Sequence, residues 1–224
     1  MAFFVDFSKY KYKNRQEENT VNIGWIEGTK DYCTGEVTKE FLLYLWEYMK
    51  FPFYQTRGIY HNITLDGENA MFIAVFDGYE IPMGSYEIRV IDKLNNLVYA
   101  APDLILHYII NHHYLPPKEF IEAVKNGPKP NSKEYNLYVH NIFMNKSSQG
   151  GKKLSCPLCG NRHIYFAPKK KKVFKKNADI VILNSLEVEQ KKKDYNDYIF
   201  YGICENCGRL FEFENNILKK KLNL

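Results

Sequence analysis

Four cysteines in two similar short motifs are the residues of this chain best suited to chemistry. Cys156-Pro-Leu-Cys159-Gly lies past the middle of the sequence and Cys204-Glu-Asn-Cys207-Gly lies near its end, with 44 residues between Cys159 and Cys204. A Cys-x-x-Cys turn, here called a knuckle, directs two sulfurs at one point, and the glycine after it lets the backbone leave with a positive φ. The two knuckles therefore predict one structural Zn²⁺ bound tetrahedrally by Cys156, Cys159, Cys204 and Cys207.

Two other uses of such motifs are a redox-active Cys-x-x-Cys pair and a disulfide. Duplication of the knuckle, each time with its glycine, favours zinc over both. Because four thiolates leave a zinc ion no open position, this ion is expected to hold the fold and not to activate water. His163 lies close to the first knuckle, but a fifth ligand is surplus, and we expect this residue on a strand.

The residues around the knuckles predict the small sheet that such a site needs. Apolar and aromatic residues favour strands at 163–167, 180–183, 198–203 and 210–213. A sheet of this size has little core of its own, so bound zinc is expected to supply much of its folding energy. The sequence thus predicts a β-rich zinc-ribbon domain with four cysteine ligands over residues 154–224, with an enlarged central loop.

Charge divides the chain into two unlike halves. Residues 1–127 contain 12 Lys and Arg against 17 Asp and Glu, a net charge of −5, whereas residues 128–224 contain 19 against 9, a net charge of +10. Lysine clusters in the second half alternate with aromatic residues, which could follow a phosphate backbone and stack on bases. Nucleic acid is therefore one predicted partner, with Lys169, Lys170, Lys171, Lys172, Lys175, Lys176, Lys191, Lys192 and Lys193 as candidate contacts.

Two other interpretations of these lysines stay open. They could be solvated loop faces that keep an exposed hairpin soluble. They could also dock onto an acidic protein surface, such as the acidic first half of a second copy. Only five of the 31 basic residues are arginine, and Asn, Ile and Tyr are plentiful, as AT-rich coding would produce, so lysine abundance alone is weak evidence for a polyanionic partner.

The first half, residues 1–127, reads as a small α+β domain. Alternating apolar residues predict strands at 21–25, 71–76, 86–91 and 97–100, the last two joined by a turn at Asn95-Asn96. Helices are expected after the N-cap Thr38, after Pro102-Asp103 and after Pro116-Pro117. Residues 128–153 read as a linker that contains a bridging strand at 135–143, which could belong to either domain.

Several blocks of the first half resemble an uncharacterised bacterial domain family. They are Val21-Asn22-Ile23-Gly24-Trp25, Gly35-Glu36-Val37, Thr56-Arg57-Gly58, Glu87-Ile88-Arg89-Val90 and, most specifically, residues 97–124. The resemblance covers about residues 3–125 and implies a bacterial or bacteriophage origin but no activity.

The chain departs from this family at one place. Many members carry two cysteines shortly after the Thr-Arg-Gly element, which could share a metal with histidines that match His107 and His113. This chain has Ile59-Tyr60-His61-Asn62 there and no cysteine between Cys33 and Cys156. We therefore expect side-chain packing in place of a second metal site.

The polar groups left in the first half are Arg57, His61, Asp103, His107, His112 and His113. A helical turn could bring His107 and His113 together, so a polar site made of Arg57, His61, His107 and His113 is one hypothesis, and capping or core roles are the alternative. The sequence has no glycine-rich phosphate loop, no nucleophile elbow and no His-Glu-x-x-His motif. A hydrolase centred on those four residues is thus the least favoured function.

The favoured function is a non-enzymatic, zinc-binding two-domain protein whose basic ribbon binds nucleic acid. The alternative is a protein-interaction module, such as an inhibitor, immunity factor or adaptor in a bacterial or phage conflict system. A hydrophobic content of 45% and an aromatic content of 16% predict a packed globular protein. The N-terminal residues do not read as a signal peptide, no stretch is apolar enough to span a membrane, and the cysteine usage fits a reducing compartment, with Cys33 as a buried thiol. We therefore expect a cytoplasmic protein.

Overall fold

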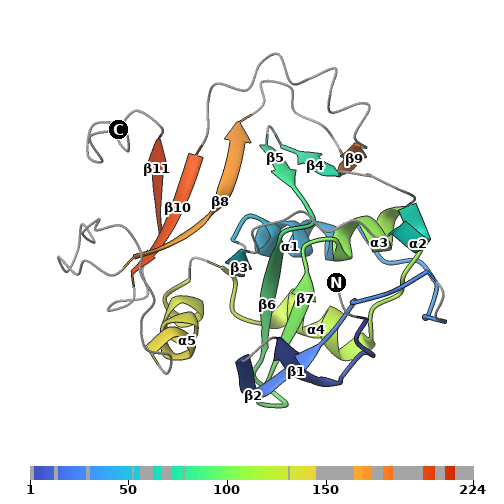
Figure 1. The fold of residues 1–224 in the computed structure, drawn as a ribbon, viewed down its shortest axis with the longest axis horizontal. Coiled ribbons are helices and arrows are strands. Elements are labelled where there is room, and N and C mark those ends of the chain that lie inside the picture. The colour runs from blue at the N-terminus through green and yellow to red at the C-terminus, as the bar shows by residue number, and fades with distance from the viewer. Residues whose placement is uncertain are drawn as a thin grey trace.

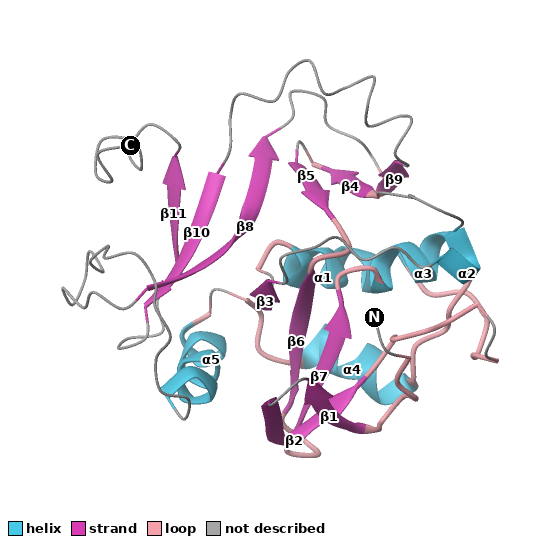
Figure 2. Ribbon diagram, viewed as in Figure 1, coloured by secondary structure: helices cyan, strands magenta, loops and turns pink. Residues whose placement is uncertain are grey.

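The fold is taken from a computed structural model (Figure 1), which describes residues 3–12, 15–28, 31–51, 53–55, 63–66, 72–77, 79–130, 132–144, 164–172, 179–183, 199–204 and 210–214. The described residues contain both helices and sheets, which confirms the α+β class (Figure 2). None of the helices in these ranges is long and apolar enough to cross a membrane.

The first sheet is built by the N-terminal part of the chain and has the strand order β1-β2-β7-β6-β3. Only β2 and β7 run parallel, and the other neighbours are antiparallel. The predicted hairpin is confirmed, since β6 and β7 pair from Glu87 with Pro102 to Asp92 with Leu97, and Asn96 takes the positive φ that the turn needs. The strands are β1 (Lys9–Tyr12), β2 (Arg15–Asn22), β3 (Phe53–Gln55), β6 (Tyr86–Asp92) and β7 (Leu97–Pro102).

The second sheet joins strands from both parts of the chain in the order β11-β10-β8-β5-β4-β9, all antiparallel. The four strands expected around the zinc knuckles all form, close to their predicted positions. The division of the chain into domains at residues 127 and 154 stays a prediction, and this sheet contains strands from either side of it. Its strands are β4 (Ile73–Phe76), β5 (Tyr79–Pro82), β8 (Ile164–Lys172), β9 (Val181–Leu183), β10 (Ile199–Cys204) and β11 (Leu210–Glu214).

Helices α1 (Lys39–Met49) and α4 (Lys118–Asn126) contact β6 and each other. Thr38 caps α1 as predicted, because its hydroxyl oxygen accepts a hydrogen bond from the Phe41 amide at 3.2 Å. Phe41 and Phe120 meet edge to face between these helices, with both rings fully buried. Helix α3 (Ile105–His112) follows β7 after two residues and buries Ile105 and Leu106 in the same core. The short α2 covers Ile63–Asp66.

The strand predicted at 135–143 is wrong, because residues Lys133–Met144 form helix α5. The Ser132 hydroxyl accepts a hydrogen bond from the Tyr135 amide at 3.1 Å and so caps the first turn. Tyr135 and Tyr138, three residues apart, both turn to the core, and the Tyr135 hydroxyl donates to the Arg89 carbonyl at 3.0 Å. The aromatic and β-branched residues of this segment suit a strand, but a capped helix buries the two tyrosines on one face.

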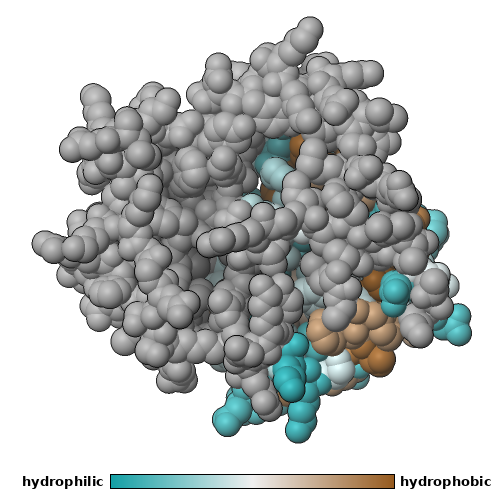
Figure 3. All heavy atoms as spheres, in the orientation of Figure 1, coloured by the Kyte–Doolittle hydropathy of each residue, from teal (hydrophilic) through white to brown (hydrophobic). Residues whose placement is uncertain are grey.

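The prediction that Cys33 is buried is also wrong, since it is an exposed free thiol. Exposed apolar side chains among the described residues are few and scattered, chiefly Val5, Phe7, Leu94, Leu137 and Val181. In the view of Figure 3, the coloured atoms at the lower right show a tan and brown area next to teal ones. Scattered side chains of this kind are normal on a protein surface and do not define a docking face.

Candidate metal centre

Three side chains of types that can bind a metal ion meet where α2 lies beside α3: Asp66, His107 and His112. Asp66 is the last residue of α2, and both histidines belong to α3. His112 ends α3, and because helical side chains lean toward the helix N-terminus, its ring reaches back toward His107. The two rings are T-shaped with centroids 4.9 Å apart.

The end of α3 is fixed by its cap. His113 adopts the left-handed conformation with φ 55°, and its amide donates to the Tyr108 carbonyl. The His113 carbonyl in turn accepts a hydrogen bond from the Gly35 amide at 2.9 Å. These backbone contacts hold His112 at the place where the helix stops.

The three ligand atoms lie very close together. Asp66 Oδ1 is 2.8 Å from His107 Nε2 and 2.7 Å from His112 Nε2, and the two Nε2 atoms are 3.2 Å apart. The cluster is also well covered, since the side chains of His107 and Asp66 are 2% and 3% exposed and that of His112 is 20% exposed. Phe72 stacks on the His107 ring with centroids 3.8 Å apart, which fixes the plane of that imidazole.

Two buried polar atoms of the cluster have no hydrogen-bond partner among the described residues: Asp66 Oδ2 and His107 Nδ1. Burial raises the pKa of Asp66, but hydrogen bonds and charge interactions with His107 and His112 outweigh it and leave the pKa below its ordinary value. Asp66 is therefore a carboxylate at neutral pH. A buried carboxylate needs positive charge or hydrogen-bond donors close to it.

Solvent reaches the cluster from the His112 side. His112 lines an open depression of about 430 Å³ together with Thr34, Gly35, Glu36 and His113. Two imidazoles and one carboxylate around one point can share protons or bind a divalent transition metal. The arrangement thus combines two buried side chains, Asp66 and His107, with a third, His112, that solvent can reach.

The sequence-predicted polar residues are distributed unevenly around this cluster. His107 belongs to it, whereas His113 is the helix cap beside it and is not one of the three convergent ligands. Arg57 and His61 lie outside the described residues, so the four-residue polar site stays a prediction. His112 is one of the polar groups noted in the first half from the sequence, but the sequence does not assign it to a site.

Asp66 was missed altogether. It lies 41 residues before His107 in a short helix without a motif, so only the tertiary fold brings it to the histidines. Its one local signal is that it is an acidic residue between Leu65 and Gly67. Signals of that kind are too common in sequences to identify a ligand.

Of the four predicted zinc ligands, only the backbone of Cys204 is described, as the last residue of β10. Cys156, Cys159 and Cys207 lie outside the described residues. Of the nine candidate lysines, Lys169 to Lys172 belong to β8, and Lys175, Lys176 and Lys191 to Lys193 lie outside the described residues. The predicted zinc site and nucleic-acid contacts therefore stay predictions.

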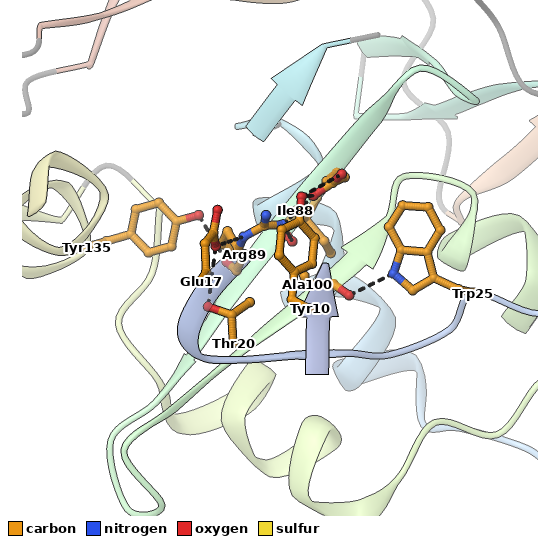
Figure 4. A network of polar contacts seen from close by, with 9 residues as sticks. Tyr10, Glu17, Thr20, Trp25, Ile88, Arg89, Ala100 and Tyr135 are labelled. Atoms are coloured by element: carbon orange, nitrogen blue, oxygen red, sulfur yellow. Dashed lines mark hydrogen bonds and ion pairs between the residues drawn. The ribbon is translucent and has the colours of Figure 1, made fainter. Parts of the chain in front are cut away.

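A second polar cluster surrounds Arg89, whose side chain is fully buried (Figure 4). Its Nη1 lies 2.7 Å from Glu87 Oε2 and its Nε lies 3.5 Å from Glu17 Oε2. The guanidinium stacks 4.5 Å from the Tyr10 ring centroid and 4.6 Å from that of Phe53. Burial alone would lower the pKa of Arg89, but the Glu87 and Glu17 carboxylates raise it above its ordinary value. With no access to solvent, this cluster is structural.

The described residues form an α+β fold with two sheets and an Asp-His-His cluster made by α2 and α3. These features define the class of the protein by its architecture and leave its activity undefined. The chain belongs to a family described as a domain of unknown function (DUF7919), whose sequence model matches residues 2–125. This confirms the family resemblance predicted for about residues 3–125. No curated protein and no solved structure matches the chain.

Proposed function

We propose that this protein is a non-enzymatic zinc-binding protein whose basic C-terminal ribbon binds nucleic acid. The observation that carries the proposal is the strand register of β8, β10 and β11. Cys204, the last residue of β10, pairs with Ile164, the first residue of β8, and Ile203 pairs with Leu210, the first residue of β11. The start of β8, the end of β10 and the start of β11 therefore lie at the same end of the sheet.

That end is the one to which both knuckles connect along the chain. The second knuckle starts at Cys204, the last residue of β10, and continues into the connection from β10 to β11. The first knuckle precedes β8, and the five Cα–Cα steps from Cys159 to Ile164 span at most about 18 Å. A zinc site with four cysteine ligands requires both knuckles at the same end of the sheet, and this register satisfies that requirement.

The zinc part is tested by metal analysis of the full chain. Cys204→Ser is expected to lose the ribbon zinc, and Cys33→Ser is the matched control, because Cys33 is an exposed cysteine outside both knuckles. Unchanged zinc content in Cys204→Ser would contradict the site. A disulfide within either knuckle would point to redox chemistry instead.

The nucleic-acid part is supported by the composition of β8, which carries Tyr165 and Phe166 together with Lys169 to Lys172. Fluorescence anisotropy with single-stranded and duplex oligonucleotides, measured against salt concentration, tests it. Lys170, Lys171 and Lys172 changed to Gln should weaken binding and reduce the slope of log K against log salt. The control changes three exposed lysines of the first half: Lys9, Lys11 and Lys118. A slope near zero in the unmodified protein would exclude the nucleic-acid role.

The alternative, a protein-interaction module, is favoured by the opposite charges of the two halves, −5 and +10. Affinity capture from the native host separates the two functions. An acidic protein that co-purifies and is displaced by salt would support the interaction module. Nucleic acid as the only co-purifying partner would support the ribbon instead.

A further inference from the structure

We propose that Asp66, His107 and His112 form a second metal site, which binds a divalent transition ion, Zn²⁺ in the first place, and keeps at least one coordination position for an exchangeable ligand. This site lies in a different part of the chain from the proposed ribbon site. Its ligands are two imidazoles and one carboxylate, whereas those of the ribbon are thiolates. It also differs from the sequence expectation that packing replaces any second metal in the first half.

The contacts within the cluster cannot all be hydrogen bonds. If both Nε2 atoms carry protons, each donates to Asp66 Oδ1, and two donors then face each other at 3.2 Å. If one Nε2 lacks its proton and Asp66 is ionised, that lone pair faces the carboxylate oxygen, so two acceptors are in contact. If Asp66 is protonated instead, its proton can be donated to only one of the two rings, and another of the three contacts still has no hydrogen bond. Every assignment leaves at least one of the three contacts unable to form a hydrogen bond, whereas a cation satisfies three converging lone pairs at once.

The separations also suit a small ion. Ligands held tetrahedrally at about 2.0 to 2.1 Å from zinc lie about 3.3 Å from each other. The three separations in the cluster are 2.7, 2.8 and 3.2 Å, so the ligand atoms need to open only by tenths of an ångström to admit an ion. His112, at the rim of the depression, is the side chain with room to make that movement.

The donor set selects the class of metal. Two imidazole nitrogens and one carboxylate oxygen suit zinc and its first-row neighbours, whereas calcium and magnesium prefer oxygen ligands throughout. A cation would also compensate the buried Asp66 carboxylate, whose Oδ2 has no hydrogen-bond partner among the described residues. Because Asp66, His107 and His112 provide three ligands, a tetrahedral ion keeps one position for water or another ligand.

The test is a Zn²⁺ titration of the full chain, first stripped with a chelator, in competition with a chromophoric chelator. The unmodified protein should bind two equivalents, and Cys204→Ser and His112→Ala should each bind one. The double variant should bind none. His113→Asn is the matched control, because it removes the neighbouring imidazole while asparagine tolerates the left-handed conformation of this cap, and it should bind two equivalents. His112→Ala should weaken the second equivalent by more than about 100-fold, because loss of a direct ligand costs more than loss of an outer-shell partner.

Failure of this site and failure of the ribbon are distinguishable. If His112→Ala binds as many equivalents as the unmodified protein while Cys204→Ser loses one, the Asp-His-His site is overturned and the ribbon stands. If one equivalent is lost in His112→Ala and none in Cys204→Ser, the ribbon is overturned and this site stands. His112→Asp keeps a ligand atom, so recovery of the second equivalent supports coordination, and its absence together with native circular dichroism counts against it.

X-ray absorption of zinc-loaded Cys204→Ser gives a readout that does not depend on removing a ligand. We expect a shell of nitrogen and oxygen at about 2.0 to 2.1 Å with imidazole scattering and no sulfur. Sulfur scattering in this variant would place the remaining ion at the cysteines and overturn the proposal.

Discussion

Arg89 shows how one side chain can hold several elements together. It lies in β6, its ion-pair partners come from β6 and β2, and its stacking partners come from β1 and β3. The Tyr10 hydroxyl contacts both oxygens of Glu87 at 3.2 and 3.0 Å, which completes the surroundings of that carboxylate. Because Glu87 and Arg89 belong to one of the blocks that carry the family resemblance, the likeness there reflects a buried charge network and not a reactive site.

Arg89→Met should therefore destabilise the fold strongly. It leaves Glu17 and Glu87 buried without their cation, and breaking a buried pair in this way costs about 3 to 5 kcal/mol. Urea unfolding measures the loss. The control is Lys93→Met, which removes an exposed pair with Glu134 and should cost less than about 1 kcal/mol. Equal effects of the two changes would show that the Arg89 network contributes little.

Asp103 should make stability depend on pH. Burial raises the pKa of Asp103 to about 7, against the lowering effect of hydrogen bonds from the backbone amides of Gly84, Ser85 and Tyr86. Since its pKa is higher in the folded than in the unfolded state, its stabilisation is full below about pH 4 and is lost as pH rises to about 7.

The matched comparison is Asp103→Asn, which keeps the shape but does not titrate. The unmodified protein should lose up to about 4 kcal/mol of unfolding free energy relative to this variant between pH 4 and pH 7. Urea unfolding at several pH values measures the difference. A relative gain over that range would mean that the amides hold Asp103 ionised.

At the scale of elements, Gly127 sets how closely the end of α4 approaches β6. A Cβ built at Gly127 would lie 2.5 Å from the Ala123 carbonyl oxygen and 2.5 Å from the Ile91 carbonyl oxygen. Both are backbone atoms. The contact with Ile91 of β6 is relieved only by moving the end of α4 away from β6, and the contact with Ala123, which lies in α4 itself, only by changing the backbone at the helix end. Glycine here is required by close approach, since its φ of −69° is open to any residue.

Gly127→Ala should accordingly cost about 3 kcal/mol, at the upper end for overpacking. Gly35→Ala is the control, because the nearest atom to its Cβ is the movable Leu115 Cδ2 at 3.0 Å, and it should cost less than about 1 kcal/mol. Thermal unfolding of the two variants measures both. A mild effect at Gly127 would mean that α4 can shift outward without losing its core contacts.

Local signals in the sequence were sufficient where each element carries its own start and stop. The cap at Thr38, the turn at Asn96 and the prolines before α4 specified α1, the β6–β7 hairpin and α4. Helix α5 was missed because Tyr135 and Tyr138 favour strands by propensity, and only their burial against the first sheet decides for a helix. The Asp-His-His cluster was missed for a related reason, since Asp66 joins it only through tertiary structure.

At the scale of the whole molecule, the second sheet joins the acidic and basic parts of the chain. Strand β8 pairs with β5, with Glu80 opposite Lys171 and Tyr79 opposite Lys172, and β9 pairs with β4. The acidic and basic parts of the chain thus contribute strands to one sheet.

This shared sheet makes a prediction that rests on the proposed ribbon zinc. In Cys204→Ser, loss of the metal should unfold β8, β10 and β11, which have a small core without it. β5 would then lose its neighbour β8, so amides of β5 such as Glu80 should exchange with solvent much faster than in the unmodified protein. Amides of β6 and β7 such as Val90 and Tyr99 should keep their protection, because they pair with each other in the first sheet and lie over the main core.

Hydrogen–deuterium exchange with peptide resolution measures both sets, with Cys33→Ser as the control. If β6 and β7 lose protection together with β5, the two sheets unfold as one cooperative unit, and if β5 keeps its protection, the zinc does not stabilise the shared sheet.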